Sequence, residues 1–368
     1  MKSQTVDQPP LWRRMEKPAW LALLALSLIL RCYGLEWRAL SYDEGVHAIY
    51  SHYLFANGQY SHTPVTHGPF LFVSNALIFS LLGESDATVR IGQAMAGAGV
   101  VFMMWYFRRY LGRAGALAAG LLLSVSPVFL FYSRYARNDI YIALFLLLWI
   151  YSALRYLGSG RFRWLLGVTL SMALSFATKE VSFLNGAIAG SFFALTAFFH
   201  LTTKPVLAQR ARRLAVMMLF LVLPFLAPLI RQKSYMTIGS LFLLDLFFIT
   251  AWFHARSSER FRPAHGLALL LLFWAIDLPL FTTFFHNRAG VLTGISGSLG
   301  YWLAQHGVQR GNQPWFYYPF LAVLYEFLPL ALSVSGVALL ALRRKNTSRM
   351  VFTTLCLWWM AGSWTLYS

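Results

Sequence analysis

Residues 18–33, PAWLALLALSLILRCY, decide the fold class together with the acidic stretch SYDEG at 41–45 that follows them. The first is an apolar run close to the roughly 20 residues with which a helix crosses a hydrocarbon core of about 30 Å. Such runs recur along the 368 residues, of which 58% are hydrophobic and 12% charged, about half the charged fraction of a soluble protein. The sequence therefore predicts an all-α polytopic membrane protein, with one transmembrane domain over 1–368.

The net charge of +18 indicates topology rather than a nucleic-acid partner. The basic residues fall in short loops between apolar runs instead of on one face, so we expect no nucleic acid to bind. The polar, basic N-terminus lacks the small-residue cleavage site of a signal peptide, so the first helix is predicted to be a retained anchor. Cys32 and Cys356 lie in or beside apolar segments and predict neither a disulfide framework nor a metal site.

Twelve apolar segments are visible, and one of them is predicted not to span the membrane. The segment 69–83 is too short for the hydrocarbon core at 1.5 Å per residue. If it lies at the outer interface, basic clusters alternate with basic-poor loops, as the positive-inside rule expects. We therefore expect about eleven transmembrane helices, near 18–33, 88–107, 114–132, 139–157, 164–178, 181–200, 214–230, 234–253, 265–285, 317–341 and 350–368. The outer loops are then 34–87, 133–138, 179–180, 231–233 and 286–316.

This topology places the protein in the cell membrane with a cytoplasmic N-terminus. Seven of the 13 acidic residues then fall on the outer side, so any chemistry is expected to be extracytoplasmic. The last segment ends at Ser368 without a polar loop or a basic stop, and we expect a carboxy-terminal part to be missing.

The acidic pair Asp43-Glu44 is the first candidate catalytic group. Residues 42–50 read as a short amphipathic helix that begins at this pair, directly after the first span. A carboxylate at a helix N-terminus stays ionised, so it can accept a proton or bind a metal. The alternative is an N-terminal capping aspartate with a solvated glutamate beside it.

Two further motifs fall at neighbouring outer helix ends. In YSRYARND (132–139), Arg134 and Arg137 violate the positive-inside pattern, and a guanidinium fork matches phosphate oxygens. Asp139 can pair with these arginines or join Asp43 as a metal ligand. In ATKE (177–180), Lys179 can neutralise a phosphate and Glu180 can hold that lysine or an acceptor hydroxyl. The alternatives are interfacial anchors for the arginines and a simple ion pair in a tight turn for 179–180.

The last outer loop is rich in aromatic, glycine and amide residues, a composition that suits sugar binding by stacking and hydrogen bonding. The candidate contacts are Tyr301, Trp302, Gln305, His306 and Arg310, and the alternative is an aromatic belt at the interface.

No pair of histidines in the first outer loop has helical zinc spacing, so we interpret them as polar loop residues. His67, ahead of Gly68-Pro69, is the one kept as a candidate substrate contact. Three acids lie within apolar segments, Asp245, Asp277 and Glu326. Each is a functional candidate, with helix–helix hydrogen bonding as the simpler account.

Taken together, these motifs resemble the GT-C membrane glycosyltransferases, including protein O-mannosyltransferases and aminoarabinose transferases, and in particular the flippase-activity-associated proteins of archaea and bacteria. The residues that carry the resemblance are YDEG (42–45), HGP (67–69), SRYARND (133–139), TKE (178–180) and GSLGYW (297–302) through Pro314-Trp315. It implies a GT-C helical bundle whose long first outer loop carries interfacial helices.

The resemblance also implies an activity. A sugar would pass from a polyprenyl-phosphate-linked donor in the membrane lipid to a glycan, lipid or protein acceptor outside the cytoplasm, with inversion. Asp43 would act as general base or metal-bound acid with Glu44 beside it, and Arg134, Arg137 and Lys179 would hold the phosphate. A divalent metal ion is the one cofactor to consider, although Asp-Glu stands where oligosaccharyltransferases have Asp-x-Asp.

Two rival functions remain open from the sequence. A lipid-linked saccharide flippase or flippase accessory protein would show polar residues near the bilayer midplane and internal repeats. Three intramembrane acids are present, but no repeat is obvious. A GT-C scaffold that only binds a partner is the other rival.

Overall fold

Every regular element that the structure describes is a helix, which confirms the predicted all-α membrane fold. The computed structural model describes residues 11–198, 204–230, 234–254, 262–305, 314, 316–342 and 347–367. The α-helices are α1 (Leu11–Cys32), α2 (Tyr42–Asn57), α3 (Phe70–Leu82), α4 (Asp86–Leu111), α5 (Arg113–Val125), α6 (Pro127–Ser133), α7 (Asp139–Ser159), α8 (Phe162–Phe176), α9 (Val181–Phe198), α10 (Pro205–Leu221), α11 (Tyr235–His254), α12 (Pro263–Phe281), α13 (Gly297–Gln305), α14 (Tyr317–Tyr325), α15 (Phe327–Leu342) and α16 (Thr347–Tyr367). Short 3₁₀ or π segments are η1 (Pro64–Thr66), η2 (Leu223–Ile230) and η3 (Val291–Ser296).

Four described helices are long and apolar enough to cross a membrane by themselves, namely α4, α7, α9 and α12. Three bent pairs bring the number to seven if each pair is one span: α5 with α6, α10 with η2, and α14 with α15. By length and composition the described helices thus supply between four and seven spans, and the count of eleven stays a prediction.

The bends follow from proline. The α5–α6 pair bends by 62° directly before Pro127, because a residue ahead of proline disfavours helical backbone. The predicted span 317–341 is divided into α14 and α15, which meet at 97° on either side of Glu326. Pro329 has no N–H to donate to the carbonyl four residues earlier, so the helix cannot continue across this point. Glu326 therefore lies at a helix break, where its Oε1 accepts a hydrogen bond from Ser126 Oγ at 2.5 Å.

The helical segments predicted in the first outer loop are present. The helix expected over 42–50 extends to Asn57 as α2, and the segment 69–83 forms α3 over 70–82. His47 stacks on Phe72 of α3 with ring centroids 5.7 Å apart, so α2 and α3 pack as a pair. Thirteen helical residues in α3 cover about 20 Å, which is short of a bilayer core. The interfacial position of α3 is a prediction that this length supports.

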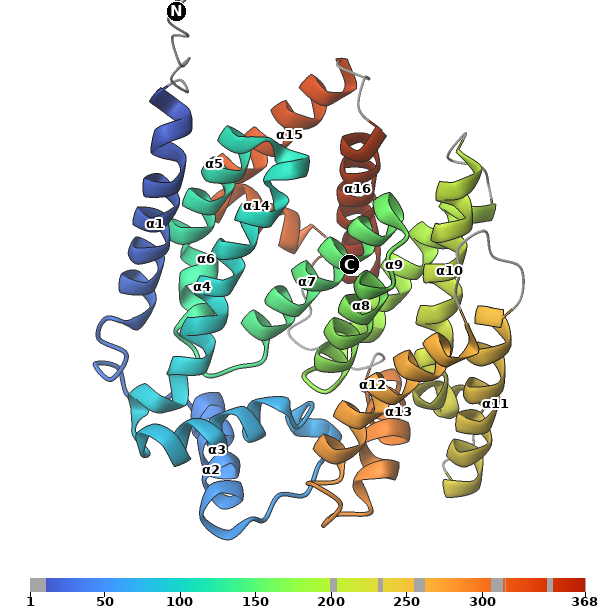
Figure 1. Ribbon diagram of the computed structural model, residues 1–368. Coiled ribbons are helices and arrows are strands. Elements are labelled where there is room, and N and C mark those ends of the chain that lie inside the picture. Colours follow the sequence, from blue (N-terminus) through green and yellow to red (C-terminus); the bar gives the residue numbers. More distant parts are fainter. Residues whose placement is uncertain are drawn as a thin grey trace, which may run out of the picture.

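Different elements lie at the two ends of the helical bundle (Figure 1). The N-terminal end of α1 lies at the upper end in that view, and α2 and α3 lie together at the lower end. The interior between the ends is packed with aromatic side chains, and Trp149, Phe193, Phe225 and Phe273 are each at most 1% exposed. This packed core fixes the helix ends from which the loops at the α2–α3 end emerge.

Candidate active site

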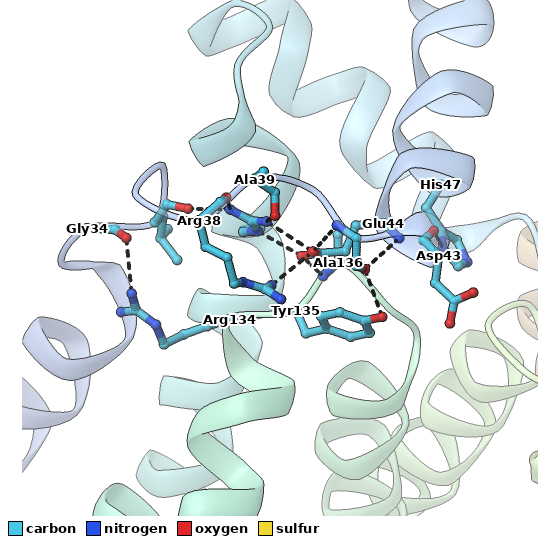
Figure 2. Close-up of polar contacts among 12 residues, drawn as sticks. Gly34, Arg38, Ala39, Asp43, Glu44, His47, Arg134, Tyr135 and Ala136 are labelled. Carbon is cyan, nitrogen blue, oxygen red and sulfur yellow. Dashed lines mark hydrogen bonds and ion pairs between the residues drawn. The ribbon is translucent and has the colours of Figure 1, made fainter.

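Glu44, in the predicted first outer loop (34–87), contacts the loop between α6 and α7. Ser41 caps α2: its Oγ accepts the Glu44 N–H at 3.4 Å, and its own N–H donates to Glu44 Oε2 at 3.0 Å. This capping box turns the Glu44 carboxylate into the protein, where it is fully buried. The carboxylate also accepts the Ala136 N–H at 3.1 Å and an Arg38 N–H at 2.9 Å (Figure 2).

Arg90, in the first turns of α4, is the strongest partner of Glu44 and was not predicted from the sequence. Its Nε and Nη2 donate to the two carboxylate oxygens at 2.7 and 3.0 Å, and its guanidinium is 1% exposed. The remaining N–H groups donate to the carbonyls of Leu35, Arg38 and Ala39. The sequence contained one sign of this role, because Arg90 lies at the predicted outer end of a span. An arginine at that place is equally typical of an interfacial anchor, so the pairing with Glu44 was not predicted.

Glu44 is ionised in this setting. Burial by itself would raise the pKa of the Glu44 carboxyl, but the hydrogen bonds from Arg90, Ser41 and Ala136 hold that pKa below its usual value. Its two oxygens accept five hydrogen bonds from protein groups. Glu44 therefore holds the start of α2 in position, and neither of its carboxylate oxygens is left to contact substrate.

Asp43 points away from this buried network, as Figure 2 shows. Its side chain is 44% exposed, and its Oδ2 lies 3.1 Å from Arg137 Nη1. Arg137 Nε lies 3.9 Å from Asp139 Oδ2, and Lys179 Nζ contacts Asp139 Oδ1 at 2.6 Å. The structure thus brings together four predicted residues from three separate loops, in the order Asp43, Arg137, Asp139, Lys179.

His67 and Glu180 form a second group beside it. His67 Nδ1 lies 2.8 Å from Glu180 Oε2, and its ring stacks on Trp302 with centroids 5.4 Å apart. The Trp302 Nε1–H is buried and has no hydrogen-bond partner among the described residues. This group joins the first loop, the α8–α9 turn and α13 through three predicted substrate contacts.

Gly68 explains why the first loop can approach the α8–α9 turn so closely. The Gly68 N–H donates to the Thr178 carbonyl at 3.1 Å, and the Phe70 N–H donates to the Ala177 carbonyl at 2.9 Å. A Cβ at position 68 would lie 2.2 Å from the Ala177 carbonyl oxygen, so only glycine fits. His67 has a φ of +66°, a conformation that L-residues adopt rarely, and it is held there by this docking.

His47 supports Asp43 from the next turn of α2. Its Nδ1 lies 2.7 Å from the Asp43 carbonyl oxygen, so Nδ1 carries the proton and donates. Burial lowers the pKa of His47 to about 4, so the ring is neutral near pH 7. A neutral His47 fixes the first turn of α2 without adding charge beside Arg137.

Arg134 lies apart from the group around Asp43. It donates to the carbonyls of Leu30, Tyr33 and Gly34 at 2.9, 2.7 and 3.1 Å, and so satisfies groups at the C-terminal end of α1. Figure 2 shows the contact with Gly34. Its predicted phosphate contact has no geometric support here.

The last outer loop is described in part. Tyr301 packs edge-on against Trp302, with ring centroids 5.4 Å apart, and Gln305 ends α13. The predicted contacts His306 and Arg310 lie outside the described residues.

The described residues do not make a ligand set for the divalent metal considered above. No three His, Cys, Asp or Glu side chains gather in the part of the chain that the structure describes. The carboxylates of Asp43 and Asp139 already face Arg137 and Lys179, which compete with a cation for the same oxygens.

Comparison with known proteins fits this geometry. Residues 66–230 match the family described as dolichyl-phosphate-mannose-protein mannosyltransferase, a range that includes His67, Arg137, Asp139 and Lys179. No curated protein matches the chain.

Solved structures are similar to this chain at low sequence identity, and the first of the two below shows the fold. An oligosaccharyltransferase of Archaeoglobus fulgidus, tethered with an acceptor peptide, is 14% identical with a TM-score of 0.57, over 94% of this chain and 47% of its own. The Saccharomyces cerevisiae protein O-mannosyltransferase Pmt1–Pmt2 complex bound to the sugar donor is 20% identical with a TM-score of 0.48, over 73% of this chain and 34% of its own. The chain thus spans less than half the length of these two relatives. It is a helical membrane protein with a GT-C-type fold, and its residues 66–230 are similar to the dolichyl-phosphate-mannose-protein mannosyltransferase family.

Proposed function

We propose that the protein transfers a sugar from a polyprenyl-phosphate-linked donor to an acceptor on the extracytoplasmic side, with inversion at the anomeric carbon. The observation that carries the proposal is the convergence of a half-exposed Asp43 with Arg137 and Lys179. A base and two phosphate-binding cations from three loops are what a displacement with a phosphate leaving group requires.

The roles follow from the charges. An acceptor hydroxyl gives its proton to Asp43 while its oxygen bonds to the anomeric carbon. The bond from that carbon to the phosphate oxygen breaks, and polyprenyl phosphate leaves with the electron pair. Arg137 and Lys179 stabilise the charge that develops on that phosphate.

Arg137 also couples donor binding to the base. In the structure it lies 3.1 Å from Asp43 and 3.9 Å from Asp139, within reach of both carboxylates. An arginine that turns to the donor phosphate releases Asp43, whose freed oxygen can then accept a proton. Glu44 and Arg90 hold the start of α2 so that Asp43 faces this place.

The sugar itself is assigned to the group of His67, Glu180 and Trp302. A stacked ring pair, a carboxylate and an unpartnered indole N–H supply an apolar face, an acceptor and a donor. Sugars present both C–H faces and hydroxyl groups, so this combination suits a hexose. Tyr301 extends the aromatic side of the group.

The test is release of polyprenyl phosphate from a polyprenyl-phosphate sugar with a labelled hexose, by the protein reconstituted in vesicles. We expect Asp43→Asn and Arg137→Ala each to lower the rate by about 10² or more, as loss of a base or of charge stabilisation does. Glu36→Gln, an exposed acid of the same loop, is the matched control and should retain the wild-type rate. Label that crosses the bilayer without release of polyprenyl phosphate would overturn the transferase and leave the flippase.

A further inference from the structure

The end of the bundle opposite Asp43 contains a pocket of about 640 Å³ with a basic lining. It lies between the C-terminal ends of α4 and α7 and the starts of α5 and α8. The helix length that separates the two sites is about 25 Å, measured along α4 from Arg90 to Arg108 or along α7 from Asp139 to Arg155. The pocket is therefore separate from the candidate active site. Five arginines line it, Arg108, Arg109, Arg113, Arg155 and Arg163.

The positive-inside rule alone predicts arginines at this end of the bundle, but it does not predict that five of them line one pocket. The part of the chain that the structure describes places one carboxylate beside them, Glu16 of α1. Glu16 lies 3.3 Å from Arg113 and 3.9 Å from Arg108, and the second distance is too long for a hydrogen bond. One carboxylate among five guanidinium groups leaves a strong attraction for a further anion.

The aromatic walls hold the guanidinium groups in place. Arg108 lies over the ring of Trp105 at 3.5 Å, and Arg155 lies 4.6 Å from the ring centre of Trp164. Arg155 also donates to the hydroxyl of Tyr151 at 2.8 Å. Cation–π contacts and this hydrogen bond reduce the side-chain freedom that binding would otherwise remove. The Trp164 Nε1–H is buried without a partner among the described residues, so a donor is also available.

We propose that this pocket binds the phosphate headgroup of an anionic membrane phospholipid. The guanidinium fork matches the oxygens of a phosphate. Basic pockets between helix ends at the cytoplasmic face are where anionic headgroups bind. The charge pattern predicts that this end is cytoplasmic, and the exposed aromatic and apolar residues nearby, Tyr106 and Leu111, give acyl chains a surface. The site would hold a lipid that is neither donor nor acceptor.

Native mass spectrometry of the detergent-purified protein tests this, with dioleoylphosphatidylglycerol against dioleoylphosphatidylcholine. We expect the anionic lipid to bind preferentially, and Arg109→Gln with Arg163→Gln to weaken it about 30-fold, from the cost of two basic residues near a membrane surface. Both side chains are exposed, so the double variant should fold and should keep the wild-type melting temperature.

The matched control is Arg161→Gln with Arg212→Gln, which removes the same charge from exposed positions outside the pocket lining. Equal weakening in the control would overturn the pocket, because it would show a diffuse charge effect. Equal binding of the two lipids would overturn the headgroup assignment. Glycerophosphoglycerol has the same phosphodiester headgroup without acyl chains, and binding as tight as that of the lipid would show a soluble ligand and overturn the lipid.

Discussion

Replacing Glu44 with glutamine removes the charge at the centre of the buried network while it keeps the side-chain shape. Glu44 Oε1 accepts two of its five hydrogen bonds and Oε2 accepts three. A glutamine amide offers one oxygen and one NH₂ group, so two or three buried donors would face another donor. The Arg90 guanidinium, 1% exposed, would lose its counter-charge. Breaking a buried pair from one side costs about 3–5 kcal/mol.

A double-mutant cycle separates this pair from its surroundings. Glu44→Gln, Arg90→Gln and the double variant would be unfolded in mixed micelles with increasing sodium dodecyl sulfate, and the free energies of unfolding compared. We expect each single change to cost about 3–5 kcal/mol and the double change to cost clearly less than their sum, by at least about 2 kcal/mol. Asp43→Asn, which alters a half-exposed acid one residue away, should cost less than about 1 kcal/mol.

Additive costs in the cycle would refute the reasoning, because they would show that Glu44 and Arg90 do not stabilise each other. A cost below about 1 kcal/mol for Glu44→Gln would refute it as well, since it would mean that the carboxylate is not the acceptor for five donors. The depressed pKa of Glu44 gives the sign of the acid response. Its contribution is present at and above the ordinary glutamate pKa and is lost as the pH falls through the lower folded-state value.

Further predictions test the site piece by piece. Gly68→Ala should lower sugar transfer at least about tenfold, because its Cβ would meet the Ala177 carbonyl, whereas Gly45→Ala has open space and should be silent in the same assay. The pKa of His47 falls from 6.5 to about 4 in the folded protein, so between these pH values the unfolded chain binds a proton that the folded protein excludes. The free energy of unfolding should therefore drop by about 3 kcal/mol as the pH falls from 6.5 to 4. In His47→Gln the free energy of unfolding should depend less on pH over this range. Arg134→Gln should lower the melting temperature and leave the KM for the donor unchanged, while Lys179→Gln should raise that KM, and the reverse pattern would restore the predicted phosphate contact of Arg134. Chelation with EDTA should change the rate less than twofold, and loss of activity that Mn²⁺ restores would contradict the assignment of Asp43 as a base paired with Arg137.

Much of the architecture was predictable because a bilayer imposes simple rules. Apolar length and the positions of Lys and Arg predicted an all-helical membrane protein, and the pattern over 42–50 predicted a helix that begins at the acidic pair. The structure confirms this helix but shows that Ser41, and not Asp43, is the residue that caps it. The segment 69–83 was predicted not to span because it is short; the 13 residues of α3 support this, and its interfacial position stays a prediction. The sequence did not reveal the 97° break at Glu326, because the proline responsible lies three residues beyond it in an unbroken apolar run.

The sequence by itself determined which of the predicted outer loops carry charged and polar side chains, and therefore which residues could meet. Asp43, Arg137, Asp139 and Lys179 were all identified from residue type and predicted topology, since few charges sit beside a membrane without a reason. Only the tertiary structure decided how they are divided. Glu44 lies in a buried network with Arg90, whereas Arg134 binds carbonyl groups at the end of α1. Asp43 is half exposed beside Arg137. The physical reason is that neighbouring residues on a helix point in different directions, so the packing of α2 against α3 and α4 determines which carboxylate is buried.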